Sequence, residues 1–309
     1  MRNIVLTSLT IVGLVFSQLA AADGPTATQL TFNSADDVNP AWSPDGTKIA
    51  FASDRSVNRD IWVIPATGEP PATQLTFHPV VDDEPAWSPD GTQIAFTSSR
   101  DAGYAHIFVM SSSGGAATQL TSGSWDDAGA TWSPDGSMIA FGSGRSGNLD
   151  IWVIPSTGGL ATQLTSHPGF DFDPSWSPDG SKIAFVSTRA GGIYNDIWVM
   201  SASGEPATQL TTFMGDDDDP AWSPNGTQIT FSSSRGPTGS DIWLMPSTGE
   251  PPATKLTFTS GFDGKPAWSP DGTQIAFQSQ RNGNMNIWVI NLRTTSVEPT
   301  TWGAIKLKF

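Results

Sequence analysis

Short apolar runs alternate with turn-forming residues along most of the chain, and the runs repeat. In the first repeat "KIAFAS" (48–53) and "DIWVI" (60–64) have strand length, and segments rich in Gly, Pro, Asp and Ser separate them. Neither alternate position is polar within "IWVI" (61–64). A sheet with one face in water would alternate, so we expect both faces of these strands to be buried between neighbouring sheets.

The segment "AWSPDGTKIAF", which begins at Ala41, occurs six times with small changes. Its tryptophans follow one another at intervals of 45, 45, 44, 46 and 46 residues: Trp42, Trp87, Trp132, Trp176, Trp222 and Trp268. A period of about 40 to 50 residues with several short strands in each unit is typical of a β-propeller. The sequence therefore predicts an all-β fold, a six-bladed β-propeller.

Each blade is expected to contain four antiparallel strands. The first strand ends at the motif tryptophan, and Ser-Pro-Asp-Gly forms the turn into the second. The third strand resembles "DIWVI" and the fourth resembles "ATQLTF". The fourth-strand segments begin at Ala27, Ala72, Ala117, Ala161, Ala207 and Ala253. The copy at Ala27 precedes the first blade, so it would close the ring as the outer strand of blade six.

Six copies of "WSPDG", each followed by "DIW" or a variant and separated by "QLT", resemble the propeller repeats of the TolB-like family. The resemblance covers about residues 27–290 and implies a six-bladed propeller closed on itself. It implies less about function. TolB carries an amino-terminal α/β domain and works with the Tol–Pal envelope system, whereas here we expect a propeller without that domain. Serine peptidases with similar propellers carry a hydrolase domain, which we do not expect here.

The first 22 residues have the pattern of a secretory signal peptide. Arg2 precedes an apolar run (4–16), and three alanines (20–22) precede Asp23. We therefore divide the chain into a signal peptide (1–22), the propeller (23–295) and a carboxyl-terminal arm (296–309). The protein is expected to be exported, to the periplasm or the extracellular space, with no membrane span once the signal is removed.

The charge of the chain narrows the range of partners. The formal net charge is −15, and the chain has no Cys, which excludes disulfides and thiol chemistry. A protein of this charge repels nucleic acid and anionic lipid and favours cations or basic proteins. We expect no cofactor, with Ca²⁺ as the alternative.

An acid and an arginine recur in every blade. The acid lies five residues before the motif tryptophan and is expected in a loop at the rim of the central channel: Asp37, Asp82, Asp127, Asp171, Asp217 and Asp263. The arginine follows that tryptophan by 13 residues: Arg55, Arg100, Arg145, Arg189, Arg235 and Arg281. We favour a structural ring of ion pairs on one face. The alternative is a Ca²⁺ or substrate site formed by the six carboxylates.

Further acids and aromatic residues break the repeat in the loops of this face. The residues that we single out for partner binding are Asp216, Asp218, Asp219, Trp125, Phe170, Phe172 and Phe262. The acids could instead form a solvated face, and the aromatic groups could simply pack the loops. Exposed apolar groups beside acids would form a recognition surface.

The last six residues, "AIKLKF", imitate the outer strand "ATKLTF" at Ala253, although the outer places are already filled. Three alternatives follow. One terminal strand fills blade six while the other lies loose or pairs with the protein's own surface, the spare strand completes another copy of the protein, or the tail is a sorting or anchoring signal read by the export machinery. Exchange would involve two equivalent segments: Ala27, Leu30 and Phe32, and Ala304, Ile305, Leu307 and Phe309. Both would bury similar Leu and Phe side chains, and open-ended donation would build filaments.

Catalytic motifs are absent from the sequence. His78 and His167 occupy equivalent His-Pro positions in blades two and four, and His106 replaces the Asp of "DIW". No Ser/His/Asp set has a credible spacing. We therefore expect a non-enzymatic scaffold for protein–protein interaction, with self-assembly as one form of it. The alternative is a monomeric binding module for an envelope or cell-surface partner, and an enzyme ranks third.

Overall fold

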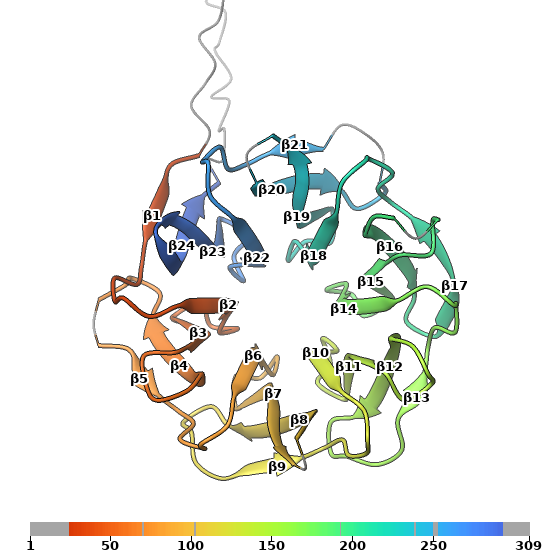
Figure 1. The fold of residues 1–309 in the computed structure, drawn as a ribbon, viewed down its shortest axis with the longest axis horizontal. Helices are drawn as coiled ribbons and strands as arrows, with labels where there is room; N and C mark the ends of the chain where they lie inside the picture. Colours follow the sequence, from red (N-terminus) through yellow and green to blue (C-terminus); the bar gives the residue numbers. More distant parts are fainter. Residues whose placement is uncertain are drawn as a thin grey trace, which may run out of the picture.

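The computed structural model describes residues 25–292, except 70, 102, 192, 238 and 250–252. The predicted signal peptide and carboxyl-terminal arm, including Ala304, Ile305, Leu307 and Phe309, lie outside the described residues. The described chain forms 24 strands in six four-stranded sheets, which stand as blades around a central opening (Figure 1). The predicted all-β, six-bladed propeller is confirmed.

The strands of each blade run antiparallel, and in blades one to five they follow chain order from the centre outward. Blades one to three consist of β2 (Asp37–Trp42), β3 (Lys48–Ser53), β4 (Asp60–Pro65) and β5 (Thr73–Gln74); β6 (Asp82–Trp87), β7 (Gln93–Asp101), β8 (Tyr104–Ser111) and β9 (Ala117–Gln119); and β10 (Asp127–Trp132), β11 (Met138–Ser143), β12 (Asp150–Pro155) and β13 (Thr162–Gln163). Blades four to six consist of β14 (Asp171–Trp176), β15 (Lys182–Ser187), β16 (Asp196–Ser201) and β17 (Gly204–Gln209); β18 (Asp217–Trp222), β19 (Gln228–Gly236), β20 (Gly239–Pro246) and β21 (Thr254–Lys255); and β22 (Asp263–Trp268), β23 (Gln274–Asn282), β24 (Asn284–Asn291) and β1 (Ala27–Gln29).

The ring is closed by the amino-terminal strand. β1 pairs antiparallel with β24, with Ala27 opposite Ile290 and Gln29 opposite Trp288 (Figure 1). Leu30, which follows β1, is buried, whereas Phe32 is 75 % exposed. The expectation that both apolar residues of this segment are buried is therefore wrong for Phe32, because the chain has already left the blade at that point.

The Ser-Pro-Asp-Gly turn explains why the strands reverse where they do. Ser43 donates a hydrogen bond from Oγ to Asp45 Oδ1 (2.6 Å), and the Thr47 N–H donates to the same oxygen (3.0 Å). Gly46 adopts φ +70°, and a Cβ atom there would lie 3.2 Å from Pro270 of blade six. The turn thus fixes the hairpin and also fits closely against the neighbouring blade.

The core lies between the blades. Val38, Ala50 and Ile61 of blade one pack in one cluster with Ile94 and Phe96 of blade two. Three of the six motif tryptophans, Trp87, Trp132 and Trp268, add bonds between blades: the indole N–H of Trp87 donates to Ala41 O at 3.2 Å. These contacts explain why the inner strands are apolar on both faces. Among the described residues, no helix is long and apolar enough to cross a lipid bilayer.

Candidate functional site

The recurring acid is the first residue of each innermost strand and is fully buried. The prediction of a loop position at the channel rim is therefore wrong for all six: Asp37, Asp82, Asp127, Asp171, Asp217 and Asp263. Each carboxylate instead accepts a bond from the arginine of its own blade, as between Arg100 Nη2 and both Asp82 oxygens at 2.8 Å. The same arrangement places Arg55, Arg145, Arg189, Arg235 and Arg281 on their acids.

These ring pairs, as we call them, are stabilised within the blade. The Arg100 guanidinium lies 5.2 Å from the ring centre of Phe96 and 4.8 Å from that of Phe108, and its Nε donates to Ser98. Pairing between neighbouring blades, which the sequence left open, does not occur in the six pairs described. Within the described residues no cluster of three or more His, Asp or Glu could hold a metal ion. Binding of Ca²⁺ by the six carboxylates, the alternative named above, stays a prediction.

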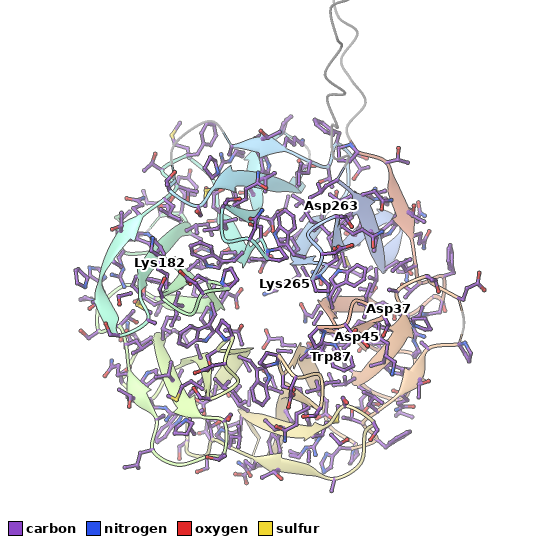
Figure 2. The ribbon with its side chains drawn as sticks, turned by 180° about the vertical axis from the view of Figure 1, so that it is seen from behind. Asp37, Asp45, Trp87, Lys182, Asp263 and Lys265 are labelled. Carbon is purple, nitrogen blue, oxygen red and sulfur yellow. The ribbon has the colours of Figure 1, made fainter. Side chains whose placement is uncertain are left out.

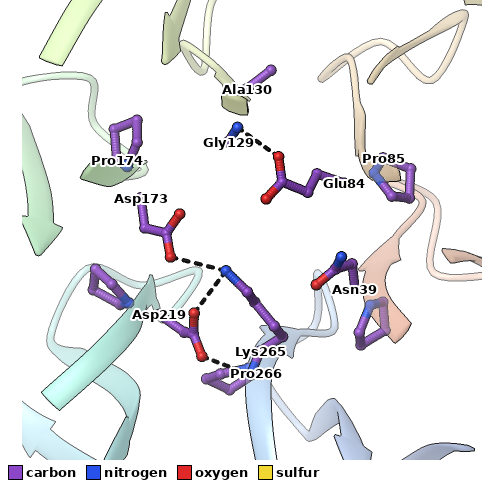
Figure 3. A pocket seen from close by; sticks show the side chains of 12 residues that line it. Asn39, Glu84, Pro85, Gly129, Ala130, Asp173, Pro174, Asp219, Lys265 and Pro266 are labelled. Atoms are coloured by element: carbon purple, nitrogen blue, oxygen red, sulfur yellow. Dashed lines mark hydrogen bonds and ion pairs between the residues drawn. The ribbon is translucent and has the colours of Figure 1, made fainter. Parts of the chain in front are cut away.

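The channel is lined by the residue two positions after each ring acid. Each of these residues lies at a β-bulge and adopts a left-handed backbone with φ between +49° and +68°. They form what we call the channel ring: Asn39, Glu84, Gly129, Asp173, Asp219 and Lys265 (Figure 3). With the Pro or Ala that follows each of them, they enclose a cavity of about 150 Å³. Left-handed positions favour Gly, Asn and Asp, so Glu84 and Lys265 are unusual there.

Lys265 is the one cation of the channel ring and points into the central opening (Figure 2). Its Nζ lies 2.8 Å from Asp173 Oδ2 of blade four and 2.8 Å from Asp219 Oδ1 of blade five (Figure 3). Burial acts to lower the pKa of Lys265, but the charges of Asp173 and Asp219 outweigh it, so this pKa is raised. The ammonium group therefore stays charged and ties blades four, five and six together across the channel.

The two carboxylates beside Lys265 respond differently to their surroundings. Burial raises the pKa of Asp173 to about 6, and the charges of Asp219 and Glu84 add to this effect while Lys265 opposes it. Burial also acts on Asp219, but the charge and hydrogen bond of Lys265, with a bond from Ser232, lower its pKa. Asp173 is thus the group of this pair that takes up a proton first.

Glu84 occupies the opposite side of the channel and is held by hydrogen bonds alone. Its Oε2 accepts a bond from the Gly129 N–H (Figure 3) and another from Thr97 Oγ1, both at 2.8 Å. Gly129 contributes no side chain, so blade three leaves a gap in the ring. The channel ring was missed from the sequence, although one signal was present: this position differs in every blade except four and five, while the residue after it is Pro in five of the six blades.

A larger cleft opens beside the channel, over blades four to six. It has a volume of about 490 Å³, and we call it the blade-five cleft. Its lining consists of Phe172, Asp173, Asp216, Asp218, Asp219, Ser232, Ser234, Gly236, Gly239, Ser240, Phe262, Lys265 and Gln278. Asp173, Asp219 and Lys265 belong to both the cleft and the channel ring, so the two hollows are continuous.

Five of the seven predicted partner-binding residues meet in this cleft: Asp216, Asp218, Asp219, Phe172 and Phe262. Trp125 does not join them, because its ring lies over Arg145 of blade three at 5.5 Å. Phe170 is 52 % exposed and lines a separate hollow with His167 and Arg189. The binding role of all seven stays a prediction.

The cleft is also where an acid titrates near neutral pH. Burial, and then the charge of Asp219, raise the pKa of Asp218 to about 7. The carboxylate keeps one hydrogen bond, from Asn195 Nδ2 to Oδ1 at 2.8 Å. An ionised Asp218 therefore lacks a counter-charge that a bound cation would supply.

Comparison with known proteins places this geometry in a family. A family model for the TolB beta propeller domain matches residues 29–131, 126–212 and 213–307. The structure of putative TolB from Agrobacterium tumefaciens is 23 % identical, with a TM-score of 0.69, and the match covers 85 % of this chain and 93 % of that one. TolB from Acinetobacter baumannii is 27 % identical with a TM-score of 0.69, over 78 % of this chain and 59 % of that one.

An enzyme shares the fold at a greater distance. Oligogalacturonate lyase from Vibrio parahaemolyticus has a TM-score of 0.62 at 14 % identity, over 87 % of this chain and 94 % of the lyase. At this identity the likeness shows the fold alone. Comparison with curated protein sequences gives no match.

Proposed function

Because this chain belongs to the TolB beta propeller domain family, whose match spans most of its length, we propose that it is an exported, non-enzymatic scaffold that binds other proteins. The partner binds on the face that carries the channel mouth and the blade-five cleft. Such a role suits a fold whose blades are rigid and whose loops differ from blade to blade.

One observation carries the proposal: the cleft combines half-buried, unpaired acids with aromatic walls. Phe172 and Phe262 border it, and Asp216 and Asp218 form no ion pair with any described residue. Apolar groups and unpaired charges at one concave surface supply both the buried contact and the orientation that protein recognition needs. The net charge of −15 favours a basic partner.

The test is site-specific cross-linking in the native cell. A photoreactive phenylalanine analogue replaces Phe172 or Phe262 in the cleft. The matched control is Phe77, which is 75 % exposed and follows β5, the outermost strand of blade one, so we call it the rim position. We expect the two cleft positions to yield the same cross-linked protein and the rim position to yield none of it. Cross-links from Phe77 alone, or none from the cleft, would contradict the proposed face.

Export is tested separately. The signal pattern in residues 1–22 predicts a mature protein that begins at Asp23. Cell fractionation followed by amino-terminal sequencing measures both the compartment and the cleavage site. Full-length protein in the cytosol would contradict export. It would say nothing about the binding face, which the cross-linking experiment tests independently.

Self-assembly is a second role, favoured by the way blade six is closed. β1 contributes three residue pairs to β24, and "AIKLKF" at 304 matches the "ATQLTF" segment that contains β1. We propose that the tail of one copy replaces β1 of another, which would build open chains of propellers. Since Leu30 is buried and Phe32 is exposed, Leu307 should matter in this exchange and Phe309 should not.

Two single substitutions in the tail, for which strand exchange predicts opposite results, test this proposal. Leu307→Asp should abolish assembly, whereas Phe309→Ser should leave it intact, as measured by light scattering and electron microscopy of the purified protein. Deletion of 296–309 should give folded monomers. A full-length protein that is monomeric at high concentration would refute strand donation, and the tail would then belong to its own blade or to export.

A further inference from the structure

Gln278 of β23 has a half-satisfied amide that lines the blade-five cleft. The side chain is 8 % exposed, and its Oε1 accepts a hydrogen bond from the Asn39 N–H at 2.9 Å. That bond fixes which end of the amide is the oxygen. No described residue accepts a bond from the other end, Nε2. Because Gln278 lines the cleft, Nε2 is free to donate a hydrogen bond to an acceptor that a ligand brings there.

The acids at the mouth of the cleft lack a cation. Asp216 Oδ1 accepts the Asn195 N–H at 3.1 Å, and Asp218 Oδ1 accepts Asn195 Nδ2 at 2.8 Å. These bonds leave the second oxygen of each carboxylate without a partner among the described residues. Lys265, the cation that lines the cleft, is already shared by Asp173 and Asp219.

The protein's own arginine sites show what such a set of groups can hold. In blade five the Arg235 guanidinium lies 5.1 Å from the ring centres of Phe213 and Phe231 and donates to Asp217. The blade-five cleft likewise offers two phenylalanines, with two unpaired carboxylates in place of the one at Arg235, and none of its lining residues is an arginine. A planar guanidinium suits this setting better than an ammonium group, because it stacks on rings and donates to two carboxylates at once.

We propose that the blade-five cleft receives an arginine side chain from an extended segment of the partner protein. The guanidinium binds Asp216 and Asp218 between Phe172 and Phe262, and a main-chain carbonyl of the same segment accepts the bond from Gln278 Nε2. This inference rests on the proposed function, since it names the chemistry that the partner must present to the cleft.

The experiment is a nuclear magnetic resonance titration with three blocked pentapeptides, acetyl-Ala-Ala-Xaa-Ala-Ala-amide, in which Xaa is arginine, citrulline or lysine. We expect the arginine peptide to shift the side-chain NH₂ signal of Gln278 and the backbone signals of 216–219. It should bind about tenfold more tightly than the neutral citrulline peptide. The lysine peptide should bind less tightly than the arginine peptide.

A matched pair of double variants locates the site. Asp216→Asn with Asp218→Asn should weaken the arginine peptide about tenfold. Asp36→Asn with Asp126→Asn removes the same charge from equivalent loops of blades one and three, where each Oδ1 also accepts a backbone N–H. This control should leave the affinity unchanged, and melting temperatures verify that both variants fold.

Equal loss in both double variants would overturn the inference, because binding would then follow the charge of the whole face, and it would leave the proposed function standing. Arginine and citrulline peptides of equal affinity, or no shift at millimolar arginine peptide, would also overturn it. Failure of the proposed function has a different signature, namely the absence of cross-links from the cleft positions in the cell.

Discussion

Two positions on the same strand, two residues apart, behave in opposite ways across the six blades. The ring acid that begins each innermost strand is Asp in every blade, fully buried and paired with an arginine. The channel-ring residue that follows is Asn, Glu, Gly, Asp, Asp or Lys, and it faces the central cavity. The ring acid is required for the ion pair inside each blade. The bulge turns the channel-ring residue toward the cavity, so its side chain can vary from blade to blade.

The largest effect is expected from breaking a ring pair. Asp82→Ala and Arg100→Ala should each lower the free energy of unfolding by about 3 to 5 kcal/mol, because each leaves a buried charge without its partner. The double variant should cost less than the sum of the two. Urea denaturation of the three variants measures this. Strict additivity would show that the two side chains do not interact.

The channel ring should be less sensitive to substitution, even at Lys265, which forms its two ion pairs. Lys265→Asn fits the left-handed backbone but leaves Asp173 and Asp219 facing each other without a cation. At pH 8 the free energy of unfolding should fall by about 1 to 3 kcal/mol. At pH 5 the loss should be smaller, since Asp173, with a pKa of about 6, is then protonated in the wild type already. A loss that is the same at both pH values would contradict this account.

The repeat explains how much of this could be predicted from the sequence. The blades, the turn at Asp45 and the acid and arginine of each blade recur at fixed spacing, so a pattern in the sequence reports them. The bulge that shifts the pairing between Val38 and Ala41 is harder to recognise, because the residue at the bulge differs between blades and only the Pro after it, present in five of the six blades, marks the place. The residues that line the channel therefore lie two positions after the acids predicted to line it. The contact between Lys265 and Asp173 could not be predicted either, because the two residues are 92 positions apart in the sequence.

The cleft acid should show a pH dependence of opposite sign to that of an ordinary ion-paired acid. The pKa of Asp218 is about 7 in the folded protein, whereas an unperturbed aspartate has a pKa of 3.8, so the folded state holds the proton more tightly. The contribution of Asp218 to stability is therefore present below about pH 4 and is lost as the pH rises to about 7. Asp219, Asp173 and Asp216 face this carboxylate and add to the repulsion.

The substitution Asp218→Asn removes the loss of stability that accompanies ionisation of Asp218 at higher pH. The amide oxygen can still accept the bond from Asn195, so at pH 8 the variant should be more stable than the wild type by about 1 kcal/mol. At pH 4 the two proteins should melt at nearly the same temperature. Thermal unfolding from pH 4 to pH 8 measures both, and parallel pH profiles would refute the raised pKa of Asp218.

The smallest effect is expected at Asn39, two residues after a ring acid. Asn39 has φ +54°, which glycine adopts freely, and its side chain makes one hydrogen bond, from Nδ2 to Asp83 Oδ1 at 2.7 Å. Its backbone N–H bond to Gln278 does not depend on the side chain. Asn39→Gly should therefore change the free energy of unfolding by less than about 1 kcal/mol. Asp37→Ala on the same strand should cost about 3 to 5 kcal/mol, because it leaves Arg55 without its buried partner. Urea denaturation of the two variants side by side compares the positions directly, and similar losses would mean that the channel ring is as structural as the ring pairs.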